Sequence, residues 1–146
     1  MIRAKKSLGQ NFLIDKNIIN KIVNILKLEN RNILEIGPGK GALTKELAKM
    51  RINICAIEID PMLCENLKNE NLKNVKIYNE DILKFDCTMM PNDYLIIGNL
   101  PYNISTPILF KFIKDIRWHK MVVMLQKEVA ERIVSIHGNK KYGRIS

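Results

Sequence analysis

The residue types best suited to chemistry in this sequence stand together in the tetrapeptide Asn99-Leu100-Pro101-Tyr102. The Asn99 side-chain carbonyl and the Leu100 backbone carbonyl can accept hydrogen bonds from the two protons of a planar amine, which frees its delocalised lone pair. Pro101 stiffens the loop, and the Tyr102 ring can stack on an extruded base, a contact worth about 1–3 kcal/mol. The segment predicts a site that activates an amine on a planar ring, although such residues also form ordinary turns.

A glycine-rich loop runs from Gly37 to Gly41, after an apolar segment that ends at Ile36. Gly37 and Gly39 let the backbone turn sharply and approach a ligand, because neither carries a Cβ. The spacing is G-x-G-x-G, which differs from the G-x-G-x-x-G of dinucleotide-binding loops. The loop therefore favours a small zwitterion, such as the methionine part of S-adenosylmethionine, over a pyrophosphate. A tight turn that binds nothing is the alternative.

Acidic residues follow the next two apolar segments. Glu58 comes 21 positions after Gly37, which is where a carboxylate can accept hydrogen bonds from both ribose hydroxyls, and Asp60 competes for that role. Asp81 can accept from the exocyclic amine of a cofactor adenine, with Ile82 flanking the ring, or it can cap a turn. Together with the glycine loop, these acids predict S-adenosylmethionine as the cofactor.

Alternating strands and helices position these motifs. Apolar runs predict strands over residues 32–36, 52–57, 75–78, 94–98 and 121–125, and helical spacing predicts helices over 17–28, 42–50, 62–69, 108–113 and 128–137. Asp15 is the expected cap of the first helix, and Thr106 caps the fourth with Pro107 at its first position. Apolar strands separated by helices indicate a parallel sheet covered on both faces. Each polar motif then lies at the carboxyl edge, where such sheets bind ligands.

Composition narrows the function classes. The 146 residues fit one domain, and a net charge of +9 favours a polyanionic partner such as nucleic acid, although a drift in base composition would produce the same excess of lysine. Three scattered cysteines and two histidines lack the spacing of a disulfide framework or a metal site. With no apolar run of membrane length and no leader pattern, we expect a soluble, cytoplasmic protein. The last seven residues resemble a loop, which suggests that the chain is a fragment.

The chain resembles the ribosomal RNA adenine dimethylases, in the branch that acts on small-subunit RNA. The resemblance covers residues 8–13, 35–39, 98–107, 125–129 and 141–144. It implies an α/β fold of the class I methyltransferases, which is Rossmann-like with a mainly parallel sheet. Residues 1–146 would form the catalytic domain that binds S-adenosylmethionine, without its last strands and a C-terminal helical domain. A base-sandwiching aromatic residue would belong to that missing part.

The same resemblance implies roles for individual residues. Asn11 and Leu13 would close over the cofactor, which Gly37, Glu58 and Asp81 bind, and Asn99 would contact both cofactor and target amine. Arg3, Lys5 and Lys6 could neutralise RNA phosphates or simply form a charged terminus. The implied partner is small-subunit rRNA in a pre-30S particle. The protein is expected to be a monomer that uses no metal ion. The alternatives are methylation of DNA adenine or a protein glutamine, and an RNA-binding ribosome-assembly factor that retains the fold but does not catalyse methyl transfer.

Overall fold

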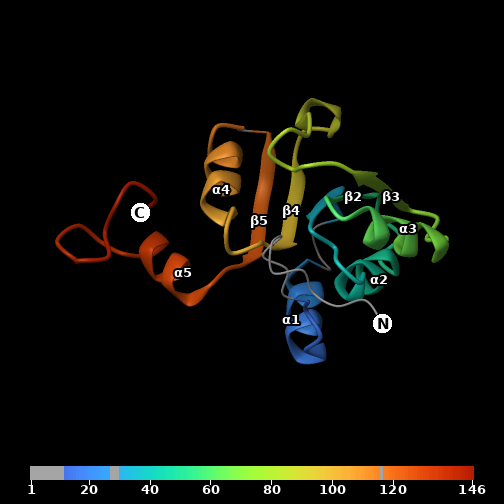
Figure 1. Cartoon of the computed structure of the whole chain (residues 1–146), viewed down its shortest axis with the longest axis horizontal. Coiled ribbons are helices and arrows are strands. Elements are labelled where there is room, and N and C mark those ends of the chain that lie inside the picture. The colour runs from blue at the N-terminus through green and yellow to red at the C-terminus, as the bar shows by residue number, and fades with distance from the viewer. Residues whose placement is uncertain (1–11, 27–29, 116) are drawn as a thin grey trace.

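The computed structural model describes residues 12–26, 30–115 and 117–146. Five parallel strands form one sheet in the order β3-β2-β1-β4-β5. They are β1 (Ile33–Ile36), β2 (Ile54–Glu58), β3 (Val75–Asn79), β4 (Tyr94–Asn99) and β5 (Trp118–Met124). The strand order reverses between β1 and β4, and ligands bind at such a switch point in open parallel sheets. The predicted α/β class and parallel sheet are confirmed (Figure 1).

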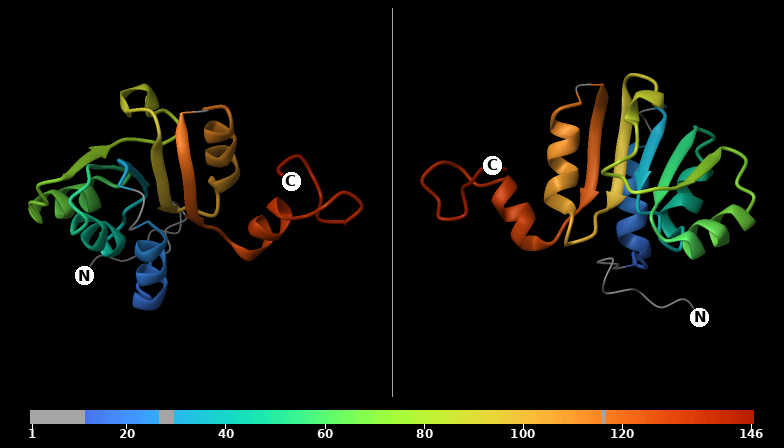
Figure 2. Two further views of the ribbon diagram at one scale, coloured as in Figure 1. Left: turned by 180° about the vertical axis from the view of Figure 1, so that it is seen from behind. Right: turned by 45° about the horizontal axis from the view of Figure 1, so that its top comes forward.

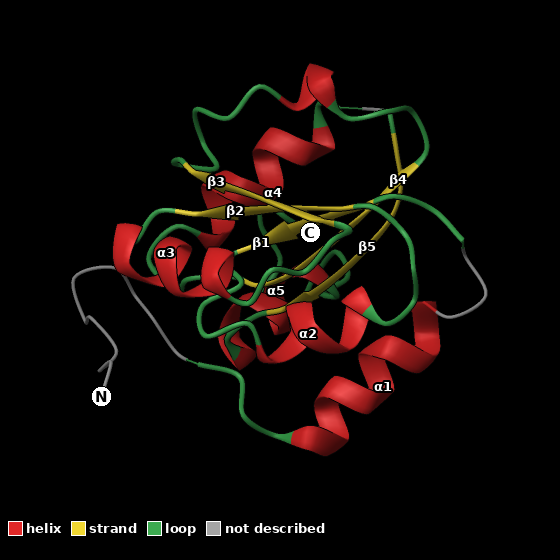
Figure 3. Ribbon diagram, turned by 90° about the vertical axis from the view of Figure 1, so that its right-hand side faces the viewer, coloured by secondary structure: helices red, strands yellow, loops and turns green. Residues whose placement is uncertain are grey.

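Helices cover both faces of the sheet, as expected for apolar strands that are buried on two sides. On one face lie α1 (Lys16–Leu26) and α2 (Ala42–Ala48), whose apolar side chains share a core with Leu95 and Ile97 of β4. On the other face α4 (Ser105–Ile113) packs against Leu34 and Ile96. Figure 3 shows the sheet between these two layers. The α3 helix (Pro61–Asn69) contacts β2 and β3.

Local signals account for several helix starts. Asp15 caps α1 as predicted, because its Oδ1 accepts hydrogen bonds from the N–H groups of Asn17 at 2.8 Å and Ile18 at 3.3 Å. Asp60 caps α3 in the same way, accepting from the Met62 N–H at 3.1 Å, and Pro61 occupies the first turn. Asp60, which competed for the ribose role, is therefore engaged in a helix cap.

Several predicted bounds need correction; α2 ends at Ala48 and not at Met50, and β5 begins at Trp118 and not at Met121. The α4 helix begins at Ser105, so Thr106 and Pro107 lie inside its first turn and Ile104 occupies the cap position without a side-chain hydrogen bond. The helix starts early because proline is accommodated anywhere in a first turn, where N–H groups have no intrahelical acceptor. The α5 helix (Lys127–Ile133) ends four residues before the predicted His137, and none of its residues is buried. It extends away from the sheet in Figure 2, so little packing supports a longer helix.

A short 3-10 helix, η2 (Cys87–Met89), was not predicted. Asp86 caps it by accepting from the Thr88 N–H at 2.9 Å. Among the helices of the described residues, none is both long and apolar enough to cross a membrane.

Candidate active site

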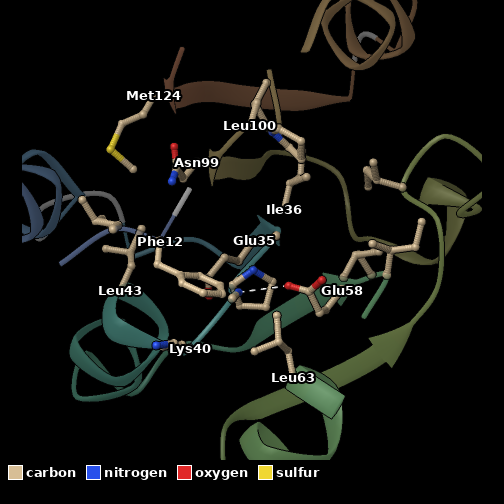
Figure 4. A pocket seen from close by; sticks show the side chains of 18 of the residues that line it. Phe12, Glu35, Ile36, Lys40, Leu43, Glu58, Leu63, Asn99, Leu100 and Met124 are labelled. Atoms are coloured by element: carbon tan, nitrogen blue, oxygen red, sulfur yellow. Dashed lines mark hydrogen bonds between the residues drawn. The ribbon is translucent and has the colours of Figure 1, made fainter. Parts of the chain in front are cut away.

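One pocket lies at the carboxyl edge of the sheet, across the switch point between β1 and β4. It is lined mainly by apolar side chains with a few polar groups among them, as is usual for sites that bind small ligands. Its walls combine the loop after β1, the ends of β2, β4 and β5, and the segment before α1. Most of the predicted residues meet here: Leu13, Gly37, Gly39, Glu58, Asp81, Ile82, Asn99, Leu100 and Pro101 all line the pocket. Figure 4 shows the labelled side chains converging on this space.

The glycine loop adopts a conformation that few other residues could take. Gly37, Gly39 and Gly41 have φ angles of 64°, 60° and 77°, in the left-handed region that favours glycine. A Cβ at Gly37 would stand 3.7 Å from the backbone oxygen of Asn99, so the loop after β1 adjoins the loop after β4. These two loops form neighbouring walls because Ile36 and Gly98 are register partners in adjacent strands.

Glu58 ties the end of β2 to the glycine loop. Its Oε2 accepts a hydrogen bond from the Gly39 N–H at 3.0 Å (Figure 4), and its Oε1 accepts from the Asp60 N–H at 3.0 Å. The side chain is 5% exposed, and burial raises the pKa of Glu58 although both backbone donors oppose the shift. A carboxylate has about four lone-pair positions, so acceptor capacity remains for ligand hydroxyls.

Glu35 is a pocket residue that the sequence reasoning missed. It sits in the middle of β1, is 2% exposed, and lines the pocket. Burial raises its pKa to about 7. Its Oε2 makes no hydrogen bond within the described part of the chain. The available signal was an acid inside the apolar strand Ile33-Leu34-Glu35-Ile36, since a buried acid normally has a partner.

Phe12 and Lys40 are two further residues that the motifs did not single out. The Phe12 ring packs on the glycine loop, where a Cβ at Gly39 would come within 3.1 Å of it. The Lys40 ammonium group lies 4.8 Å from the centre of the same ring, a favourable cation–π distance. Through these contacts the segment before α1 meets the glycine loop at the pocket (Figure 4).

Asp81 has a turn-forming role as well as a place in the pocket. Its Oδ1 accepts from the Leu83 N–H at 2.9 Å, and its backbone oxygen accepts from Lys84 and Phe85. The two interpretations of Asp81 are therefore compatible, because a carboxylate held by a turn keeps a fixed orientation at the pocket wall.

Other predicted residues lie outside the pocket or outside the described chain. Tyr102 is not among the described lining residues, and its side chain is 51% exposed next to Pro101. Asn11, Arg3, Lys5 and Lys6 fall outside the described residues. No cluster of three or more His, Cys, Asp or Glu side chains able to hold a metal ion occurs among residues 12–26, 30–115 and 117–146.

The pocket fits the predicted cofactor in its donor and acceptor chemistry. The unpaired Glu35 oxygen offers an acceptor to an ammonium group, and Glu58 offers acceptors to hydroxyl groups. Gly37 and Gly39 line the pocket, so a side chain at either position would occupy space beside Asn99 or Phe12. Apolar walls from Ile36, Leu63 and Ile82 suit a ring and a hydrocarbon chain.

Comparison with known proteins identifies relatives of the chain. The model of the ribosomal RNA adenine dimethylase family matches residues 1–146. The ribosomal RNA small subunit methyltransferase A of Francisella tularensis subsp. novicida is 49% identical over 154 residues, a match that covers 99% of this chain and 58% of the relative. The chain thus spans little more than half the length of that curated relative.

Two solved structures extend the comparison. A dimethyladenosine transferase from Plasmodium falciparum superposes with a TM-score of 0.81 at 31% identity, covering 92% of this chain and 50% of that protein. The 23S rRNA methyltransferase ErmE superposes with a TM-score of 0.75 at 30% identity, covering 84% of this chain and 50% of that protein.

Proposed function

Because the chain belongs to the ribosomal RNA adenine dimethylase family, we propose that its whole protein dimethylates the exocyclic N6 of two adjacent adenines near the 3′ end of small-subunit rRNA. S-adenosylmethionine would supply a methyl group bonded to positively charged sulfur. The observation that carries the proposal is the shared pocket of Asn99, Leu100 and Glu58, which joins amine acceptors to a nucleoside-binding acid. The curated relative is named for the small-subunit RNA.

Some residues of the pocket bind the cofactor, and others activate the target amine. Glu58 and the glycine loop hold the cofactor, with Glu35 as a further acceptor. Asn99 Oδ1 and the Leu100 carbonyl accept from the amine, and so draw the nitrogen towards tetrahedral geometry. Tyr102, exposed beside Pro101, offers a stacking face to the extruded base. Because the residues need only position and polarise the amine, the chemistry requires no metal.

We also propose where and on what the protein acts. The net charge of +9 supports an RNA partner, and the family supports a monomer that meets small-subunit precursors in the cytoplasm and contributes to their maturation. Light scattering of the whole protein tests the monomer, and co-sedimentation with pre-30S particles tests the partner.

The direct test offers the whole protein four substrates under single-turnover conditions. Small-subunit particles lacking the modification, large-subunit RNA, duplex DNA and a glutamine-containing protein are each incubated with labelled S-adenosylmethionine. We expect N6,N6-dimethyladenine in the small-subunit RNA alone. Label in DNA or protein supports the methyltransferase alternatives, whereas cofactor binding without transfer to any substrate supports the assembly factor.

A further inference from the structure

Met124, at the end of β5, lies beside Asn99 in the pocket. The two residues are register partners in adjacent parallel strands, so their side chains leave the sheet on the same face. Their neighbours two positions earlier, Ile97 and Val122, pack into one core cluster on that face. Figure 4 shows the Met124 side chain projecting next to the Asn99 amide.

A backbone hydrogen bond joins Met124 to Leu100, in the loop that follows β4. The Leu100 N–H donates to the Met124 carbonyl at 3.1 Å. On its other side, the Asn99 backbone oxygen stands close to Gly37, where an added Cβ would come within 3.7 Å. The Asn99 position is therefore held between Gly37, which has no side chain, and the flexible thioether side chain of Met124.

The transfer of two methyl groups to the same nitrogen places a specific requirement on the residues around Asn99. In each transfer the N6 lone pair forms an N–C bond while the methyl–sulfur bond breaks, its electron pair goes to sulfur, and the nitrogen loses one proton to solvent. After the first transfer, a methyl group replaces one of the two N–H groups that could donate a hydrogen bond to Asn99 or Leu100. That methyl group needs apolar space beside these acceptors before the second transfer.

We propose, on the basis of the proposed function, that Met124 determines how many methyl groups are added, by yielding space for the first methyl group during the second transfer. An unbranched thioether with three rotatable bonds changes shape without leaving a fixed cavity. The Met124 side chain is half-buried, packs against the core on one side and lines the pocket on the other. Met124 acts as a specificity residue, because it contacts the substrate amine's substituent and moves no proton.

The test compares the rates of the two transfers in the whole protein. Met124→Phe fills the space, and we expect the second-step rate relative to the first to fall roughly ten-fold or more, since one misfit methyl group costs about that factor. Met124→Ile, of similar size but stiff and well suited to a strand, should lower the same ratio several-fold. Met89→Phe, at a methionine that is 53% exposed on η2, is the control.

A binding measurement needs no turnover. Fluorescence anisotropy compares an RNA oligonucleotide carrying N6-methyladenine with the same oligonucleotide carrying adenine, in the absence of cofactor. We expect Met124→Phe to weaken binding of the methylated RNA selectively. Equal losses for both RNAs, or a rate ratio within two-fold of wild type in both variants, would overturn the inference. Failure of the wild type to methylate any adenine would instead refute the proposed function.

Discussion

Glu58 Oε2 accepts a hydrogen bond from the Gly39 N–H at 3.0 Å, which joins the acid at the end of β2 to the loop after β1. The bond explains how two motifs 19 residues apart act as one binding surface. It shapes the loop before any ligand arrives, and preformed sites bind more tightly because less ordering is needed on binding.

Replacement of Glu58 tests this surface. Glu58→Ala removes the ribose acceptor and leaves the N–H groups of Gly39 and Asp60 without their partner. We expect the dissociation constant for S-adenosylmethionine to rise roughly 10- to 100-fold, as for loss of a charged hydrogen bond. Calorimetry measures it, with Glu65→Ala on the exposed side of α3 as the matched control. An unchanged affinity would indicate that Asp60, and not Glu58, accepts hydrogen bonds from the ribose hydroxyls.

Asn99 should affect the rate much more than cofactor binding. Asn99→Ala removes one acceptor for the target amine, so we expect the single-turnover rate to fall roughly 10²- to 10³-fold. Cofactor affinity should change much less, because Glu58 and the glycine loop remain. Asn92→Ala, at an exposed amide beyond the opposite end of β4, is the control. Near-normal turnover in the Asn99 variant would contradict its role.

Gly98 is required by close packing of the sheet. A Cβ there would stand 2.6 Å from the Ile36 backbone oxygen, which cannot move without disturbing β1. We expect Gly98→Ala to lower the free energy of unfolding by about 2–3 kcal/mol, as overpacked cores do. Gly143→Ala, with open space around the new Cβ, should change it by less than about 0.5 kcal/mol. Urea titration of the whole protein measures both changes. A larger loss of stability in Gly143→Ala than in Gly98→Ala would contradict the expectation.

Glu35 should make stability depend on pH. Burial raises its pKa from 4.5 to about 7, so the folded state holds a proton that the unfolded state releases. That contribution to stability is complete below pH 4.5 and is lost as the pH rises towards 7. Glu35→Gln stays neutral, so its stability gain over wild type should be roughly 2 kcal/mol larger at pH 8 than at pH 5. Urea titrations at both pH values measure the gain. The same difference in free energy of unfolding between the two proteins at pH 5 and pH 8 would exclude Glu35 as the source of the pH dependence.

Much of the site was predictable because its residues follow apolar strands directly. Gly37, Glu58, Asp81 and Asn99 each come at or just after a strand end, and parallel strands bring such positions to one edge whatever their exact bounds. Helix ends were less predictable. Pro107 is compatible with several first-turn positions, so its place in the sequence did not fix the start of α4 at Ser105.

The amino-acid sequence alone determined the fold class, the order of strands and helices, and the family, because apolar periodicity and short motifs are local properties of a chain. Tertiary structure decided which residues meet. Met124 became a neighbour of Asn99 through strand register. Glu35 became a buried acid, with one oxygen that lacks a hydrogen bond, through the layers on both sides of β1. Register and burial depend on contacts between distant segments, and spacing along one chain does not encode those contacts directly.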